Sequence, residues 1–179
     1  MQVTNKKLYT VEKEVFVKLE NSLKTKLGEG ALPATLGNLT HRGFEVSAES
    51  LPDVCHLLMT EKEFLFDYLS CISGIDNGSE RNTMAVVYHL YSIPFGHTIM
   101  LKVIVGRSLE EGNLPVVPSL ASLWKSANWM EREVYDMFGI QFSSHPDLRR
   151  ILLPADWQGY PLRKDYNTQD YYHGIKVDY

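Results

Sequence analysis

Residues 83–105 read TMAVVYHLYSIPFGHTIMLKVIV and hold the strongest strand signals in the chain. Thr83–Tyr91 and Thr98–Val105 are rich in the valine, isoleucine, tyrosine and threonine residues that favour β-strands. Because Pro94-Phe95-Gly96 separates them, the two strands are predicted to form a hairpin. The fold class that follows is α+β: a small mixed or antiparallel sheet around this hairpin with packed helices, then a long helix and an extended C-terminal arm.

The first part of the chain contains two helix patterns and one short strand pattern. Apolar side chains recur at every fourth position of Val11–Leu27, which predicts an amphipathic helix that stops at Gly28. Gly43–Ala48 is a short strand candidate. Ser50-Leu51-Pro52 predicts the start of a second helix, since serine caps helices and proline is tolerated in the first turn.

Between this second helix and the hairpin the patterns are mixed. Thr60 and Glu63 have the spacing of a capping box, which predicts a further helical segment over residues 64–69. From Leu69 to Ile75 both strand and helix fit the pattern. Asp76–Ser79 is predicted to be a turn, because Asp, Asn, Gly and Ser favour turn conformations.

The carboxyl group of Glu131 lies in an unusual place on a predicted helix. Residues 107–118 are expected to be a loop, and Ser119–Phe138 then has helical periodicity, ended by Gly139. Glu131 falls in the middle of the apolar face, where an ionised carboxylate is costly unless it is paired and hydrogen-bonded. It therefore predicts a cationic or hydrogen-bond-donating partner. The apolar face consists of Leu120, Leu123, Trp124, Ala127, Val134 and Phe138.

Three explanations for Glu131 stay open on the sequence. The first is a structural ion pair that clamps the arm to the helix, with Arg149, Arg150 or Arg163 as the cation. The second is a contact with another subunit, and the third is a proton-handling carboxylate with a raised pKa. The opposite face of the helix carries Trp129, Arg132, Glu133 and Asp136. It is either a protein-binding face, since Trp and Arg are enriched at interfaces, or a solvated face with one exposed Trp.

The C-terminal residues 141–179, called the arm below, have a different character. Pro146, Pro154 and Pro161 recur at a spacing that no ordinary helix tolerates. Residues 145–166 could reach on the order of 65–70 Å if extended. Their Trp, Tyr and Arg side chains without a core pattern predict docking on something larger. The predicted organisation is an α+β domain over residues 1–140 and a docking arm over residues 141–179.

Composition excludes several classes of function. The 179 residues carry a formal net charge of −4, which disfavours a nucleic-acid binder because phosphate neutralisation needs a surplus of cations. Two cysteines, Cys55 and Cys71, are too few for a structural zinc site or an iron–sulfur cluster. We expect them to be reduced and mostly buried, although a disulfide stays open. Residues 1–14 lack the apolar region of a secretory signal, and no apolar run approaches the ~18 residues of a membrane span.

No catalytic pattern emerges from the remaining residues. The sequence contains no G-x-S-x-G, no P-loop and no H-E-x-x-H motif, and its six histidines show no helical ligand spacing. We therefore expect no catalytic, cofactor-binding or metal-binding residues in this chain. A free-standing enzyme with Glu131 or Glu133 as general base and a nucleic-acid-binding module are the competing hypotheses from other classes.

Two long segments resemble the thirty-kilodalton subunit of respiratory complex I, which is also called its C or J subunit. They are WKSANWMEREVYDMFGI over residues 124–140 and, in the arm, HPDLRRILLP and DWQGYPLRKDY over residues 145–154 and 156–166. The match is dense over about residues 120–166, whereas the tail after Tyr166 follows no pattern that can be transferred.

The resemblance implies an accessory subunit of proton-pumping NADH:quinone oxidoreductase, an enzyme only as the whole complex. In that family this subunit carries no cofactor, while FMN and iron–sulfur clusters belong to partner subunits. It sits in the peripheral arm of a hetero-oligomer, against the large quinone-site subunit and neighbouring iron–sulfur subunits. The implied location is the cytoplasmic side of the cell inner membrane, or its organellar equivalent, reached only through partners. The equivalent subunit of a membrane-bound hydrogenase or of a ferredoxin- or plastoquinone-linked complex is the alternative.

The same resemblance assigns a structural clamp, within and between subunits, to a set of residues. They are Trp129, Glu131, Arg132, Glu133, Asp136, His145, Arg149, Arg150, Trp157, Tyr160, Arg163, Lys164 and Asp165. If this role is correct, Arg163→Ala should lower the amount of assembled complex while activity per assembled complex stays nearly unchanged. Normal assembly with lost turnover would contradict it.

Overall fold

The computed structural model describes residues 13–36, 42–108 and 113–177. The chain divides into two compact units, one of residues 1–71 and 87–103, the other of residues 72–86 and 104–179. Three long strands contribute residues to both units. They are β3 (Tyr68–Asp76), β4 (Thr83–Ser92) and β5 (His97–Gly106).

The first unit begins with two helices and two short strands. Helix α1 spans Lys13–Leu27 and is followed by the 3-10 turn η1 (Glu29–Ala31). The strands β1 (Ala34–Leu36) and β2 (Gly43–Glu45) precede helix α2 (Leu51–Thr60). The predicted helix is confirmed from Lys13 onward, its first residues lying outside the described part of the chain. The predicted second helix is confirmed, and the strand at residue 43 is shorter than expected.

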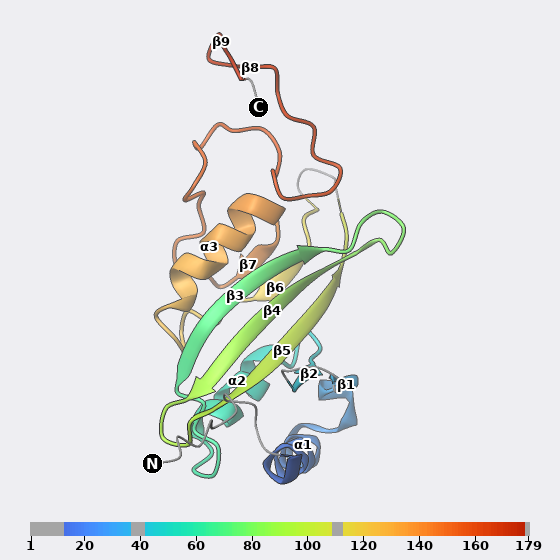
Figure 1. The fold of residues 1–179 in the computed structure, drawn as a ribbon, viewed down its shortest axis with the longest axis vertical. Helices are drawn as coiled ribbons and strands as arrows, with labels where there is room; N and C mark the ends of the chain where they lie inside the picture. Colours follow the sequence, from blue (N-terminus) through green and yellow to red (C-terminus); the bar gives the residue numbers. More distant parts are fainter. Residues whose placement is uncertain (1–12, 37–41, 109–112, 178–179) are drawn as a thin grey trace, which may run out of the picture. The chain divides into compact units, whose positions relative to one another are not determined.

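The long strands belong to a five-stranded sheet with the order β1-β2-β5-β4-β3 (Figure 1). Strand β1 pairs with β2 antiparallel, and β2 pairs with β5 parallel, so the sheet is mixed. At the β2–β5 pair, a Cβ on Gly43 would lie 2.2 Å from the Met100 carbonyl oxygen, so only glycine fits. The predicted hairpin strands are confirmed as β4 and β5. Residues 69–75, whose pattern fits both a strand and a helix, belong to strand β3.

The helical segment predicted after Thr60 is wrong. The Thr60 hydroxyl donates to the His56 carbonyl oxygen at 2.7 Å, which makes Thr60 the last residue of α2 and not the cap of a new helix. The chain then turns, and Leu65 adopts a left-handed φ of 40°, which a helix cannot contain. Residues 61–67 form turns that lead into β3.

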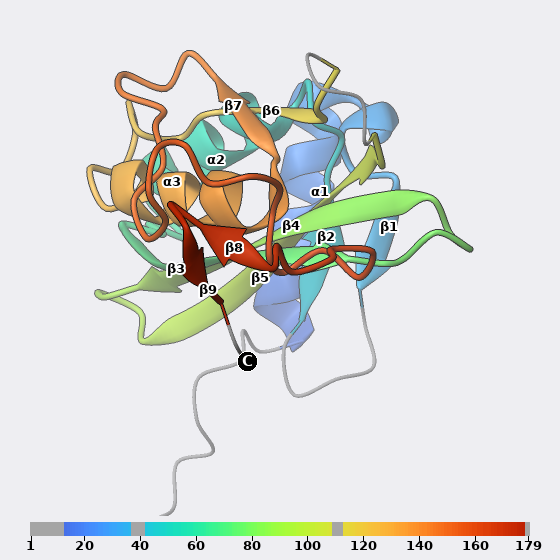
Figure 2. The ribbon, with the colours of Figure 1, turned by 90° about the horizontal axis from the view of Figure 1, so that it is seen from above.

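The second unit holds a short two-stranded sheet, one helix and the arm. Strand β6 (Val116–Pro118) pairs parallel with β7 (Gln141–Ser143), and helix α3 (Ala127–Phe138) connects them. A hairpin of β8 (Tyr171–Tyr172) and β9 (Ile175–Lys176) follows. Figures 1 and 2 both show the arm running beside α3 and over its C-terminal end.

Helix α3 is shorter than the sequence predicts. Residues 119–126 form turns, because the Leu123 and Trp124 N–H groups both donate to the Leu120 carbonyl oxygen. The expected loop over residues 107–118 contains strand β6. The predicted end of the helix is confirmed, since Gly139 takes the left-handed conformation with φ of 67°.

Two further sequence expectations concern cysteines and membranes. The structure has no disulfide between the two cysteines, and only Cys55 is buried, whereas Cys71 is exposed on β3. In the described ranges, none of the helices combines the length and the apolar character needed to cross a bilayer.

Candidate subunit interface on helix α3 and the arm

Asp136 fixes the beginning of the arm to α3. Its carboxylate is fully buried and accepts three consecutive backbone N–H groups, from Ile151 at 3.0 Å, Leu152 at 2.7 Å and Leu153 at 2.9 Å. The Arg150 guanidinium donates to its other oxygen at 2.7 Å. Burial by itself raises the pKa of this carboxyl, but the bonds from Leu153 and Arg150 outweigh it, so the pKa lies below its ordinary value.

Arg163 caps the C-terminal end of α3. Its guanidinium donates to the carbonyl oxygens of Phe138 at 2.6 Å and Gly139 at 3.3 Å, and to Ser108 at 2.8 Å. A buried cation is favourable here, because the last carbonyl groups of a helix carry partial negative charge. Gly139 has no room for a side chain, since a Cβ would lie 2.6 Å from the Tyr160 ring.

A second buried carboxylate, Asp76 at the end of β3, holds the arm farther along the chain. It accepts the backbone N–H of Lys164 at 2.8 Å and that of Gly78 at 2.8 Å. Arg107 bridges it to Asp165, donating to Asp76 at 3.0 Å and also to the Asp165 carboxylate. Burial raises the pKa of Asp76, and the bonds from Lys164 and Arg107 outweigh burial, so that the pKa is lowered.

The predicted opposite face of α3 is only partly exposed. Arg132 is buried and donates to the backbone carbonyl oxygens of Arg149 and Arg150, each at 3.1 Å. Asp136 is buried too, so the prediction that both lie on a solvated or partner-binding face is wrong, because the arm covers them. Two residues of this face do point outward. The Trp129 side chain is 66% exposed, and the Arg132 guanidinium lies 5.6 Å from the centre of its ring. Glu133 is exposed as well.

Glu131 lies on the core face, as predicted, but an arginine is not its partner. Both carboxylate oxygens accept hydrogen bonds, from the Ser119 hydroxyl at 2.6 Å and from the Leu120 N–H at 2.7 Å. His145 Nε2 lies 3.8 Å away, and both side chains are completely buried. Burial raises the pKa of Glu131 to about 7 in spite of these two donors. The ion pair expected with an arginine is therefore wrong.

The remaining predicted residues are distributed along the arm. Arg149 is exposed and pairs with Asp147 at 2.9 Å. Trp157 donates its indole N–H to the Tyr166 hydroxyl at 3.1 Å. The Tyr160 ring contacts two guanidinium groups, those of Arg150 at 5.1 Å and Arg163 at 4.8 Å. Lys164 is exposed and contributes its backbone N–H, not its ammonium group, to the Asp76 contact.

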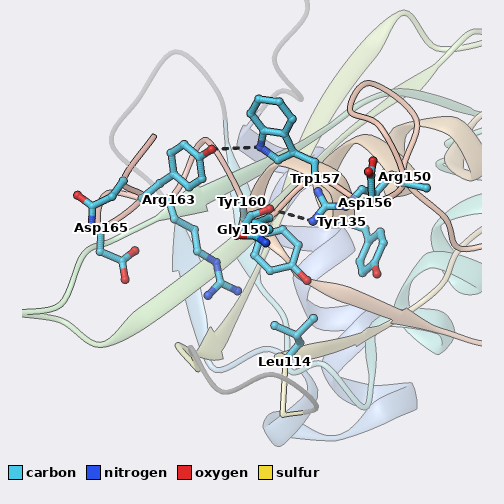
Figure 3. A pocket seen from close by; sticks show the side chains of 13 residues that line it. Leu114, Tyr135, Arg150, Asp156, Trp157, Gly159, Tyr160, Arg163 and Asp165 are labelled. Carbon is cyan, nitrogen blue, oxygen red and sulfur yellow. Dashed lines mark hydrogen bonds between the residues drawn. The ribbon is translucent and has the colours of Figure 1, made fainter. Parts of the chain in front are cut away.

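An open pocket of about 890 Å³ lies between the arm and the C-terminal half of α3 (Figure 3). Arg150, Trp157, Tyr160 and Arg163 line it, and Figure 3 shows the bonds from Trp157 to Tyr166 and from Arg150 to Gly159 at its wall. These polar groups are occupied by contacts within the chain. Across the described residues, no group of three His, Cys, Asp or Glu side chains is placed to hold a metal ion.

Three residues of this arrangement are not predicted by the sequence patterns. Asp76 was assigned to a turn and Arg107 to a loop, and Ser119 was counted as the first residue of a helix. Only Asp76 carried a usable signal, because an aspartate that precedes a turn glycine often accepts its backbone N–H, as it does from Gly78. The partners of Arg107 and Ser119 lie 31 and 12 residues away, at distances that no local pattern specifies.

Comparison with known proteins shows the family of this chain. The family model described as "Respiratory-chain NADH dehydrogenase, 30 Kd subunit" matches residues 44–172. The C subunit of NADH-quinone oxidoreductase from Chlorobium phaeobacteroides is 44% identical over 159 residues, covering 88% of this chain and 92% of the relative.

Two solved structures are similar as well. A trypsin-resistant fragment of Nqo5 is 33% identical with a TM-score of 0.56, covering 73% of this chain and 99% of that one. A chain of a membrane-bound sulfane sulfur reductase, an archaeal respiratory membrane complex, has a TM-score of 0.67 at 22% identity and covers 86% of each chain, which shows a shared fold alone. The family model spans α3 and most of the arm, and this chain belongs to the 30 Kd subunit family of respiratory-chain NADH dehydrogenase.

Proposed function

We propose that this chain is a cofactor-free accessory subunit in the peripheral arm of proton-pumping NADH:quinone oxidoreductase. In this proposal α3 and the arm scaffold the large quinone-site subunit next to neighbouring iron–sulfur subunits. FMN and the iron–sulfur clusters then belong to partner subunits, and catalysis is a property of the whole complex. The complex would hold the chain on the cytoplasmic side of the inner membrane.

The observation that carries this proposal is the contrast between the two sides of the arm. Its charged and backbone groups are bound to α3 and β3, through Asp136 and Asp76. Large apolar side chains point outward instead: in the arm Leu152 is 63% exposed and Leu162 55%, and on the neighbouring α3 Trp129 is 66% exposed. Holding a chain segment rigidly while exposing Trp and Leu is what a preorganised protein interface requires, because less entropy is lost on binding.

Trp129→Ala is expected to lower the amount of assembled complex several-fold. Tryptophan is enriched among interface hot spots, and truncating a hot-spot residue costs about 2 kcal/mol or more of binding free energy. The isolated chain should lose less than about 1 kcal/mol of unfolding free energy, since the exposed stacking of Arg132 on Trp129 contributes only weakly. The measurement is the complex band on a native gel from membranes, with NADH:quinone turnover per assembled complex.

Lys125→Ala is the matched control, an exposed change just before the same helix that should leave assembly unaltered. Arg163→Ala should also reduce assembly, but it removes bonds inside this chain and so tests the proposal less sharply. Full assembly of the Trp129→Ala variant, or full assembly with lost turnover, would contradict the scaffold role.

The alternative is the equivalent subunit of a related membrane complex, a hydrogenase or a ferredoxin- or plastoquinone-linked enzyme. Its support is the fold shared with the sulfane sulfur reductase chain. The electron donor distinguishes the two, and it would bind to other subunits. Partner identification therefore separates them.

A further inference from the structure

The surroundings of Glu131 contain no fixed positive charge. Among the described residues, His145 is the only basic side chain with a nitrogen within 4.0 Å of a Glu131 oxygen. The Arg132 guanidinium, one residue along α3, is occupied by the carbonyl oxygens of Arg149 and Arg150. An ionised Glu131 would therefore be a completely buried anion with two neutral donors, Ser119 and Leu120, and no cation.

The backbone contacts both ring nitrogens of His145. Its Nδ1 accepts the backbone N–H of Asp147 at 3.0 Å. Its Nε2 lies 3.0 Å from the Asn128 carbonyl oxygen, an acceptor, and 3.8 Å from the nearer Glu131 oxygen. The imidazole is therefore held by two backbone groups and does not form a close, direct hydrogen bond with Glu131.

We propose that Glu131 is a buried proton-binding site, whose carboxyl group takes up one proton from solvent and returns it within the physiological pH range, and whose ionisation loosens the joint between α3 and the start of the arm. The ligand is a proton alone, and no covalent or redox step takes place. Nothing in the proposed scaffold role requires this site, so the two claims can fail separately.

Ser119 is the group that adapts to the two states. Its hydroxyl oxygen accepts the Ala121 N–H at 3.1 Å, which directs its hydrogen toward the Glu131 carboxylate. When Glu131 is protonated, the new acid O–H needs an acceptor, and the Ser119 oxygen in contact with it has one lone pair left. The bond then reverses direction and the serine hydrogen rotates away. The burial that raises the pKa of Glu131 to about 7 supports this exchange near neutrality.

The site connects the elements that carry the arm. Ser119 follows β6, its N–H donates to the Ser143 carbonyl oxygen, and His145 comes two residues after β7. Glu131 itself lies on the same helix as Asp136, five residues before it, and Asp136 binds the arm. An unpaired charge at this position is expected to weaken the packing of all three elements, so the joint is tighter in its protonated state.

The direct test is a pH titration of the full-length chain with carbon-13-labelled glutamate side chains, followed by NMR. The Glu131 carboxyl signal is assigned as the one missing from Glu131→Gln. We expect its titration midpoint near 7, well above the value of 4.5 that is ordinary for a glutamate side chain. A Glu131 carboxyl that titrates with the ordinary value, or stays ionised below it, overturns the proposal.

Two variants separate a proton site from a merely buried residue. Ser119→Ala removes the partner of both states, but the bond to the ionised carboxylate is the stronger one, so the Glu131 midpoint should move upward. Ser122→Ala, an exposed serine nearby, should not move it. An unchanged midpoint in Ser119→Ala counts against the proposed exchange. This comparison stands even if Glu131→Gln fails to fold, since the Glu131 carboxyl signal can then be assigned through its bonds to the Glu131 backbone in the wild-type chain.

The linked stability has a defined sign. Because the folded pKa of Glu131 is raised, its contribution is fully present below about 4.5 and is lost as pH rises through about 7. Between about pH 4.5 and 7 the urea midpoint of the wild-type chain should therefore fall relative to that of Glu131→Gln. Above about pH 7 the two midpoints should change with pH in parallel. Parallel curves throughout would show that Glu131 holds no proton in this range.

Discussion

Asp136→Ala is expected to destabilise the isolated chain by about 3–5 kcal/mol, the usual cost of removing one partner of a buried ion pair. The variant leaves the Arg150 guanidinium without its carboxylate, and three consecutive backbone N–H groups lose their acceptor. Urea unfolding followed by circular dichroism measures the loss. The matched control is Glu133→Ala on the exposed face of α3, which should change stability by less than about 0.5 kcal/mol.

The effect of Asp136 also depends on pH. The pKa of Asp136 in the folded chain lies below the ordinary value. Its contribution to the free energy of unfolding is therefore fully present at pH values above the pKa of the unfolded state, and it disappears as the pH falls through the pKa of the folded state. The gap between wild type and Asp136→Ala should accordingly narrow in acid. A loss no greater than that of Glu133→Ala at neutral pH would mean that the arm is not held through this carboxylate.

Asp76→Ala is expected to have the second largest effect, near the lower end of the same range of about 3–5 kcal/mol. It removes the acceptor for the Lys164 N–H and one of the two carboxylates that Arg107 contacts. Because Asp165 stays paired with Arg107, the buried guanidinium charge keeps one of its two carboxylate partners. The loss should therefore be smaller than that of Asp136→Ala.

Trypsin gives an independent measure of the same contact, since Arg163 and Lys164 are cleavage sites next to it. Cleavage there should be faster in Asp76→Ala than in wild type, because releasing the Lys164 backbone allows the arm to open. Glu80→Ala, in the exposed turn that follows Asp76, is the control and should cleave at the wild-type rate. Equal rates for the two variants would show that Asp76 does not hold the arm.

Local sequence patterns predicted the elements well where a single repeat or a turn residue determines them. The β4–β5 hairpin follows from β-branched runs around Pro94–Gly96, and the end of α3 follows from Gly139. Periodicity alone also put Glu131 on the core face. The family followed from the long mixed-residue match over α3 and the arm, and it is confirmed.

What the sequence could not supply were contacts between distant segments. A helical wheel treats α3 as one isolated helix, so Asp136 and Arg132 were placed on an outer face that the arm in fact covers. The helix was extended back to Ser119 because its periodicity continues, yet Ser119 and Leu120 leave the helix to become the donors for Glu131. The Asp76–Lys164 contact joins residues 88 positions apart, which no local pattern encodes.

In the proposed role, α3 and the arm of this chain hold it in a respiratory complex. The most direct measurement is affinity purification of the tagged full-length chain from its native membranes in mild detergent, with partners identified by mass spectrometry. We expect to recover a large quinone-site subunit together with flavin- and NADH-binding subunits. Recovery with nickel–iron hydrogenase or ferredoxin-linked subunits would move the chain to the related complexes, and recovery of the chain without any partner would show that α3 and the arm do not hold it in a complex.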